Sequence, residues 1–413
     1  MTRESTQSLE TSAGSRVDSA PYHANPRLGA AIIRRVALPL IGAGAALSAW
    51  GAWHDLTRFG FAYLAGWCFV WSVVVGSLFF VALHYATHSL WSLVYRRVAE
   101  ALASPALLLG VLFVPVLLLA GRLYPWLDPD YVAHHPSVEA KAAYLNIEFF
   151  AVRAVVFLGV WAVFARLYVR RSLRACPQLL ASEPRPMRAW SYLFLIVFAF
   201  TVSFASFDWI MSLSPAWFST MFGVYLFAGM AVTALSALTL AVLGLRRAGA
   251  LGPEIVDRDH LYSLGALMFA FSCFWGYIAL SQFLLIWYGN LPEETVWYAA
   301  RWRGGWAWMS LVLMGLRFVL PFLALMSRSA KTNPRRLVWV SCLLLLGQVV
   351  DMHWLIVPQT PGGGPVFLLS DAGPFLLLSG LLLAAVGRFA GRHPLVAAGD
   401  PQWEESLRFE LRI

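Results

Sequence analysis

The sequence predicts an all-α integral membrane protein with about ten transmembrane helices. Of its 413 residues, 59% are hydrophobic and only 13% are charged, a balance that is not expected of a soluble domain of this length. Apolar windows of about 20 residues recur along the chain, and each is long enough to cross a hydrocarbon core roughly 30 Å thick as a helix. A soluble globular protein is therefore excluded.

Ten such windows define the expected helices. About 35 polar and basic residues precede the first window, so we expect it to be a retained helix and not a cleaved signal peptide. The expected spans, in chain order, are 36–54, 59–83, 98–120, 146–169, 189–213, 216–244, 261–288, 306–327, 337–357 and 367–387. Together they predict a transmembrane domain over 36–390, between an N-terminal tail of 1–35 and a C-terminal tail of 391–413.

Positive charges are distributed unevenly between alternate loops. The two tails and the loops on one side hold 23 Lys and Arg residues, and the loops on the other side hold five. Because Lys and Arg accumulate on the cytoplasmic side of a membrane protein, we expect both termini in the cytoplasm and an even number of spans. The net charge of +9 then reflects topology, so lipid is an expected partner and nucleic acid is not.

The chain also shows signs of an internal repeat. The fifth span ends in DWIMSLSP and the ninth in DMHWLIVP, so Asp208 and Asp351 each lie seven residues before a proline and 143 residues apart. We expect two related four-helix units, over about 59–213 and 216–357, with the first and tenth spans at their edge. Repeats of this kind are common among membrane transport folds.

Polar side chains inside the predicted spans are the candidate functional residues. A charged side chain at a helix centre costs about 2.5 to 3.5 kcal/mol on insertion scales, so such residues are expected to face protein or water and not lipid. The candidates for a proton path are Asp208, Asp351, His353, Arg317, Gln282, Ser281, Tyr277, Thr201 and Ser212, with Glu148, Arg153 and His84 as secondary members.

Helical spacing groups several candidates into stripes, because residues at i, i+4, i+7 and i+11 share a face. The stripes are Thr201, Asp208 and Ser212 in the fifth span, Ser341, Gln348 and Asp351 in the ninth, and Tyr277, Ser281 and Tyr288 in the seventh. Hydroxyls and water beside a carboxylate are what a proton-conducting chain requires. The alternative is structural: the aspartates and Arg317 form buried ion pairs that hold helices in register.

The sequence offers little for other chemistries. The four cysteines, Cys68, Cys176, Cys273 and Cys342, are scattered, and none stands in a CxxC spacing. Iron–sulfur clusters, structural zinc and c-type haem are therefore not expected on this chain. We find no Ser-His-Asp arrangement and no phosphate-binding glycine motif.

Three stretches resemble a known family. ALHYATHSLWSLVYRR, SFDWIMSLSPAWFSTMFGVYLFAG and MFAFSCFWGYIALSQFLLIWYGNLPEETVWY are similar to the F subunit of bacterial alternative complex III, within the superfamily of NrfD and polysulfide-reductase membrane subunits. The resemblance runs from about residue 35 to residue 390. It implies ten helices, arranged as two four-helix bundles plus two peripheral helices, in the bacterial cytoplasmic membrane.

The resemblance also implies partners and a function. The partners are a multihaem cytochrome c subunit, an iron–sulfur subunit, a paralogous quinol-binding membrane subunit, and smaller membrane and cytochrome subunits. Haem c and iron–sulfur clusters are expected on those partners, and no cofactor on this chain except a quinol such as menaquinol. The expected function is proton conduction coupled to quinol oxidation in a respiratory or photosynthetic complex, and the alternative is a quinol-binding or purely anchoring subunit.

Overall fold

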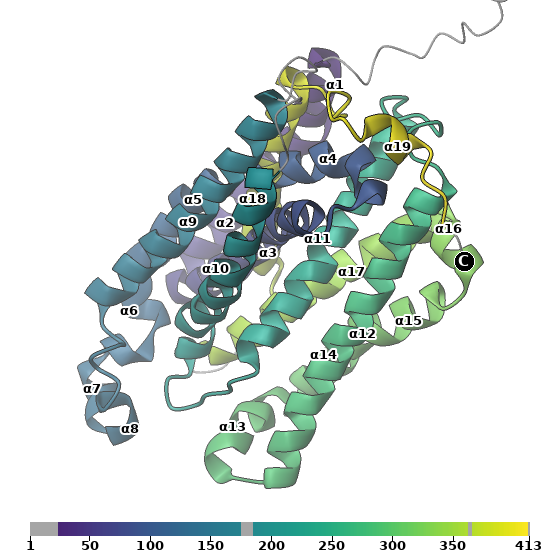
Figure 1. The fold of residues 1–413 in the computed structure, drawn as a ribbon. Helices are drawn as coiled ribbons and strands as arrows, with labels where there is room; N and C mark the ends of the chain where they lie inside the picture. Colours follow the sequence, from purple (N-terminus) through teal and green to yellow (C-terminus); the bar gives the residue numbers. More distant parts are fainter. Residues whose placement is uncertain (1–23, 175–184, 362–365, 412–413) are drawn as a thin grey trace, which may run out of the picture.

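The computed structural model describes residues 24–174, 185–361 and 366–411, and its regular secondary structure within these ranges is entirely helical (Figure 1). Ten of its helical segments are long and apolar enough to cross a membrane. The predicted all-α, ten-helix integral membrane fold is confirmed. Cys176 and most of the predicted N-terminal tail lie outside the described residues.

The spans are made of long helices, some of them interrupted. The spanning helices are α1 (Pro26–Ile32) and α2 (Leu38–His54), α3 (Leu56–Thr87), α4 (Leu93–Ala103) and α5 (Ala106–Leu118), α9 (Ile147–Arg174), α10 (Arg185–Trp209), α11 (Phe222–Arg247), α12 (Arg258–Gly289), α14 (Gly305–Met314) and α15 (Leu320–Leu325), α17 (Pro334–Ile356) and α18 (Ala372–Arg392). The short helices are α6 (Ala120–Leu123), α7 (Pro129–Ala133), α8 (Pro136–Glu139), α13 (Pro292–Arg301), α16 (Arg328–Thr332) and α19 (Trp403–Leu407).

The first span begins ten residues earlier than expected, at Pro26 and not at 36. Asn25 caps this helix, because its side chain accepts a hydrogen bond of 3.0 Å from the Leu28 amide, and Pro26 occupies the first helical position. Both are favourable helix starts. The apolar window used for the prediction did not include the start of this helix, because basic residues follow Pro26.

Three helices form the centre of the bundle. The spans that contain α3, α11 and α17 are the most buried, and these helices pack against one another. The first and tenth spans pack together through α2 and α18, where a Cβ on Gly44 would lie 2.2 Å from the Leu377 backbone. Such close backbone contact needs glycine, as is typical of helix pairs in membranes.

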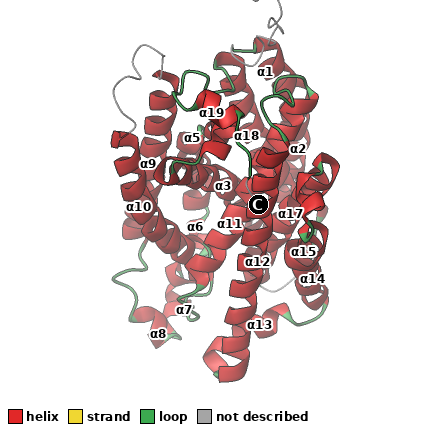
Figure 2. Cartoon of the chain, turned by 45° about the vertical axis from the view of Figure 1, so that its right-hand side comes forward, coloured by secondary structure: helices red, strands yellow, loops and turns green. Residues whose placement is uncertain are grey.

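The bundle has two ends. Helices α1 and α19 lie at one end, which we call the terminal face, and α7, α8 and α13 lie at the other, the opposite face (Figures 1 and 2). The segment 394–411, predicted as a tail, is folded onto the terminal face: Leu395, Val396, Ala397 and Trp403 are all buried. Helix α19 in this segment contacts α4.

Candidate functional site

Four carboxylates are buried among the described residues, and each faces an arginine. They are Glu100, Asp208, Asp351 and Asp371, with at most 1% of each residue exposed. Their hydrogen bonding separates them into two kinds. In two of the pairs one arginine donates to both carboxylate oxygens, and we call these closed pairs. In the other two the nearest guanidinium nitrogens lie 3.2 to 3.7 Å from the oxygens without a bidentate contact, and we call these open pairs.

Asp208 belongs to a closed pair with Arg153. Helix α9 supplies Arg153, whose Nε and Nη2 donate to Oδ2 and Oδ1 of Asp208 at 2.6 and 3.1 Å. Arg153 also donates to the Tyr144 carbonyl at 3.0 Å, and its guanidinium lies 3.8 Å from the Tyr144 ring centre. A bidentate geometry of this kind is the strongest that an arginine and a carboxylate form.

Asp371 belongs to the second closed pair. Arg58, near the start of α3, donates from Nε and Nη2 to the two Asp371 oxygens at 3.0 and 2.6 Å. The Leu368 amide adds a third hydrogen bond at 2.9 Å. The pair ties the tenth span to the second at the opposite face. Sequence reasoning missed it, because both residues lie at span ends and read as loop residues.

Asp351 belongs to an open pair with Arg317. Its Oδ1 accepts a hydrogen bond of 2.6 Å from the Tyr225 hydroxyl. Its Oδ2 lies 3.7 Å from Arg317 Nη2, too far for a direct hydrogen bond between them, and Arg317 Nε and Nη2 donate to no acceptor. The indole of Trp275, whose ring centre lies 4.9 Å from the guanidinium, faces the Asp351 carboxylate as a further hydrogen-bond donor. The Arg317 guanidinium is therefore held against Asp351 by charge, while its Nε and Nη2 have no hydrogen-bond acceptor.

The backbone explains how Arg317 reaches the centre of the bundle. It lies in a π-helical turn, Gly315–Val319, where the Leu320 amide bonds to the Gly315 carbonyl. Pro321 follows and has no amide hydrogen to offer to the Arg317 carbonyl, which favours this local widening. Such π-turns are frequent at functional sites.

Two glycines let the Arg317 side chain pass between α11 and α17. A Cβ on Gly229 would lie 2.7 Å from Arg317 Nη2, and a Cβ on Gly347 would lie 2.8 Å from Arg317 Cδ. Any larger residue would displace the guanidinium. These glycines are a requirement that the sequence alone did not reveal, because the arginine they accommodate lies on a different span.

The pair continues as a hydrogen-bonded chain toward α3. Arg317 Nη1 donates to Gln348 Oε1 at 2.6 Å, and Gln348 Nε2 donates to the Ser72 hydroxyl at 3.1 Å. We call Tyr225, Asp351, Arg317, Gln348 and Ser72 the Asp351 network. It joins α3, α11, α17 and the π-turn where the three central helices meet.

Polar residues also lie on the side of the opposite face. Gln282 of α12 donates to the Tyr298 hydroxyl at 3.2 Å. Burial raises the pKa of Tyr298 to about 12, so this hydroxyl keeps its proton at neutral pH. The Gln282 side-chain oxygen is buried without a hydrogen-bond donor, so Gln282 retains an unused acceptor beside Tyr298.

Arg301 of α13 is buried against the end of α17, on the side of the opposite face. It is fully buried, and it donates to the carbonyls of Trp354 and Leu355 at the end of α17 at 3.1 and 2.8 Å. Its guanidinium lies 3.4 Å from the Trp297 ring centre. Burial lowers its pKa to about 9, which leaves it charged at neutral pH. Sequence analysis counted Arg301 only as a loop charge.

Several predicted residues lie away from the Asp351 network. His353 points elsewhere, with Nε2 2.6 Å from the Val366 carbonyl, and its ring stacks on Trp306. Tyr277 is 66% exposed on the outer surface of α12, and Ser281 is half-buried on the same helix.

Glu148 is exposed near the start of α9. His84 is buried at the terminal face, where Nδ1 lies 2.6 Å from the Ser92 hydroxyl. The predicted candidates therefore form no single chain through the bundle.

The predicted stripe of the fifth span is interrupted by tryptophan rings. Thr201 accepts a hydrogen bond of 3.0 Å from Trp161 Nε1, and Ser212 donates to the main-chain carbonyl of Asp208 and not to its carboxylate. The Trp161 ring meets that of Trp209, the residue after Asp208, edge to face at 5.8 Å. Neither Thr201 nor Ser212 therefore hydrogen-bonds to the Asp208 carboxylate.

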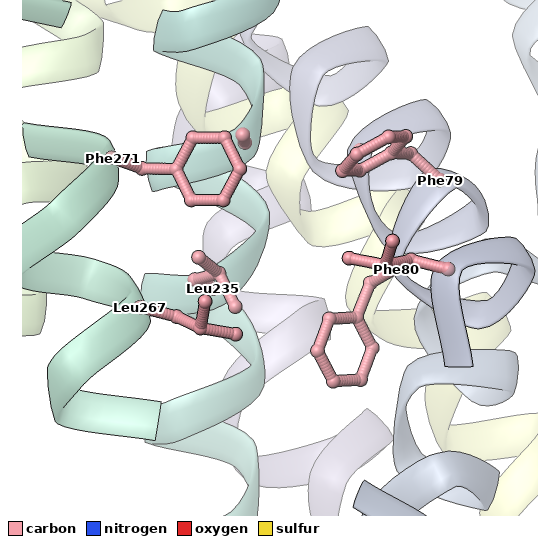
Figure 3. Close-up of a pocket in the computed structure, with 8 residues that line it drawn as sticks. Phe79, Phe80, Leu235, Leu267 and Phe271 are labelled. Carbon is pink, nitrogen blue, oxygen red and sulfur yellow. The ribbon is translucent and has the colours of Figure 1, made fainter. Parts of the chain in front are cut away.

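An apolar crevice lies between α3, α11 and α12 (Figure 3). Its cavity volume is about 10 Å³, close to the space of a single water molecule and far below the roughly 300 to 1,000 Å³ of ordinary ligand pockets. Its lining is Gly76, Phe79, Phe80, Leu83, Ala231, Leu235, Leu267 and Phe271. These side chains offer no hydrogen bond, so the crevice does not suit a quinol head group.

The comparisons with known proteins identify no family for this chain. The sequence matches no protein-family model, and a search of curated proteins finds no match. Within the described ranges, no three His, Cys, Asp or Glu side chains come together as a metal site would require.

Proposed function

We propose that this chain is a non-redox membrane subunit of a quinol-oxidising electron-transfer complex and that it conducts protons through the Asp351 network. The observation that carries the proposal is the open Asp351–Arg317 pair. The charged groups lie 3.7 Å apart without a direct hydrogen bond between them, and two guanidinium nitrogens of Arg317 are buried there without hydrogen-bond acceptors. Polar groups in this state are uncommon in native proteins and favour ordered water or an exchangeable proton.

The geometry suits proton exchange at Asp351. A separation of 3.7 Å is longer than a direct hydrogen bond and fits partners that interact through water. The carboxylate can take up a proton on Oδ2 while Oδ1 keeps its bond from Tyr225. Arg317 retains its bond to Gln348 throughout, so the change of charge does not dismantle the network.

Asp208 is better suited to holding helices in alignment than to exchanging protons. Both of its oxygens are occupied by Arg153, and a proton could be added only by breaking a bidentate charged contact. The proposal therefore assigns proton exchange to Asp351 and helix alignment to Asp208, although the sequence repeat treats the two aspartates alike.

The electron-transfer partners come from the family resemblance. Quinol oxidation would take place in a paralogous membrane subunit, and haem c and iron–sulfur clusters would be carried by the other subunits. Exposed aromatic residues support docking near the opposite face: Trp287 and Tyr288 at the end of α12 are 66% and 89% exposed, and Trp302 is 47% exposed. We expect affinity purification from native membranes to recover cytochrome c and iron–sulfur polypeptides; an active chain purified without partners would contradict this.

The central test compares Asp351→Asn with Asp208→Asn in the purified complex, reconstituted into vesicles. We expect Asp351→Asn to assemble and to oxidise quinol with fewer protons moved per electron, because asparagine keeps the size and removes the titration. Asp208→Asn should lower stability without a selective loss of proton transfer. Full proton stoichiometry in Asp351→Asn would make the aspartate structural. Loss of quinol oxidation with assembly intact would instead favour a quinol-binding subunit.

A further inference from the structure

Glu100 is a second buried carboxylate in an open pair, and it takes no part in the Asp351 network. It lies in α4, every residue of which is buried. Arg96 Nε and Arg97 Nε lie 3.2 and 3.6 Å from its two oxygens. Neither arginine makes a bidentate contact with the carboxylate, and the Ser172 side chain is a further hydrogen-bond partner of Glu100. The pair therefore resembles Asp351–Arg317 and differs from the two closed pairs.

The groups around Glu100 balance its charge. Arg96 Nη1 donates to Asp400 of the C-terminal segment at 2.9 Å and contacts His84 Nε2 at 3.1 Å. Arg97 Nη2 donates to the Ser172 carbonyl at 2.5 Å. Glu100 itself interacts with Arg96, Arg97 and Tyr85. The charged and titratable groups around these partners are His84 and Asp400 beside Arg96, and His393 and Arg392 near Arg97.

The segment 394–411 covers this cluster at the terminal face. Besides the Asp400 contact, the Ser406 hydroxyl donates to the Leu90 carbonyl at 2.6 Å. The Ser406 carbonyl lies 3.1 Å from His260 Nε2, and the Leu411 amide donates to Asp259 at 3.2 Å. The segment is thus anchored both to the α3–α4 turn and to the start of α12.

We propose that Glu100 is the proton-exchanging carboxylate of the terminal face and that segment 394–411 is the cover that controls its exchange with water. The inference rests on the proposed proton conduction. Arg96 has two carboxylate partners while the segment is docked, so Glu100 can hold a proton and Arg96 remains paired with Asp400. When the segment lifts, Asp400 leaves, Arg96 turns to Glu100, and Glu100 releases its proton. Docking of the segment and protonation of Glu100 are therefore coupled.

Buried hydroxyls lie between this cluster and the Asp351 network. His84 and Ser72 are twelve residues apart on α3, which is about 18 Å along the helix axis. Ser77 lies between them, and its hydroxyl is buried without a hydrogen-bond partner. Ser236 and Thr239 of the adjacent helix α11 are fully buried as well. These hydroxyls supply intermediate positions for transfer in the terminal half of the bundle.

The test uses Glu100→Gln in the reconstituted complex, with Glu404→Gln as the matched control, since Glu404 is an exposed carboxylate of α19. We expect Glu100→Gln to lower proton flux by about tenfold or more and to remove an infrared band of a protonated carboxylic acid, while Glu404→Gln changes neither. If Glu100→Gln conducts normally and keeps the band while Asp351→Asn does not conduct, this inference is wrong and the proposed function stands. Normal flux in both variants would overturn both.

A second experiment tests whether segment 394–411 covers the cluster. It does not depend on the assembly of Glu100→Gln. Ser172→Cys, with the native cysteines replaced by serine, places a thiol beside the cluster. We expect Asp400→Asn to raise its labelling by a membrane-impermeant thiol reagent severalfold, because the Arg96 contact that holds the segment is weakened, and Glu404→Gln to leave it unchanged. Equal labelling in the two variants would overturn the role of the segment.

Discussion

Replacing Gly229 by alanine tests whether the position of Arg317 matters for function. The new Cβ would lie 2.7 Å from Arg317 Nη2, whereas ordinary contact begins near 3.4 Å, so the guanidinium must move by roughly 0.7 Å. The atom it meets is the mobile end of a long side chain, so the backbone is not forced apart. The substitution therefore changes the Asp351 network and spares the packing of α11.

The size of the effect follows from the ion-pair geometry. If the Arg317–Asp351 separation of 3.7 Å lengthens by the whole shift, the attraction weakens by about 0.7 kcal/mol at an effective dielectric constant near 20. That is roughly a threefold change in the equilibrium between the ionised and protonated carboxylate. The intrinsic helix preference of alanine over glycine, about 1 kcal/mol, opposes any loss of stability.

The assay is proton flux in vesicles together with a thermal melt, and Gly244→Ala is the matched control. Gly244 lies on the same helix, and its Cβ would meet nothing within 4 Å. We expect Gly229→Ala to change flux by about threefold with a melting temperature equal to or above that of the native protein, and Gly244→Ala to change only the melting temperature. The same flux in both variants would refute the argument that the guanidinium position governs conduction.

Three further predictions concern stability and topology. Arg153→Gln leaves a buried carboxylate without its cation, so we expect it to lower the free energy of unfolding by about 3 to 5 kcal/mol; Arg166→Gln, exposed on the same helix, should lower it far less in the same melt. Arg301→Gln frees two carbonyls at the end of α17, so amide hydrogen exchange there should accelerate about tenfold, and exposed Arg303→Gln should not change it. Reporter fusions at the α7–α8 segment should report the exoplasm and fusions between α11 and α12 the cytoplasm; the reverse result would contradict the charge-based orientation.

Hydropathy predicted the ten spans because each span is long and apolar enough to cross the bilayer without help from another segment. Their boundaries were less predictable where charge is buried by another segment. The third span was expected at 98–120, yet its helical segment starts at Leu90 and carries Arg96 and Glu100 inside the protein. A windowed count treats such charges as the end of a helix, because it cannot include the C-terminal segment that covers them.

The sequence predicted which charged residues are buried in the candidate site, but it did not predict which arginine pairs with which aspartate. The argument from insertion cost selected Asp208, Asp351, Arg153 and Arg317, all of which are buried. Which arginine meets which aspartate depends on contacts between helices, and the stripe rule describes only the faces of single helices. The same rule grouped Tyr277 with polar positions although it lies on the outer surface of α12: periodicity identifies a shared face and does not tell which face is inside.

The two repeated aspartates differ in the contacts that their arginines make. In each predicted unit the third span supplies the arginine and the fourth supplies the aspartate. Arg153 is six residues from the start of its span, whereas Arg317 is twelve residues from the start of its own, about 9 Å farther along the helix axis. Arg153 donates to both oxygens of Asp208, whereas Arg317 reaches one oxygen of Asp351 at 3.7 Å and makes no direct hydrogen bond to it. Leaving Arg317 Nε and Nη2 without acceptors costs about 1 to 3 kcal/mol for each group, and a bidentate contact such as that of Arg153 would avoid this cost, so the open geometry favours a role beyond helix alignment.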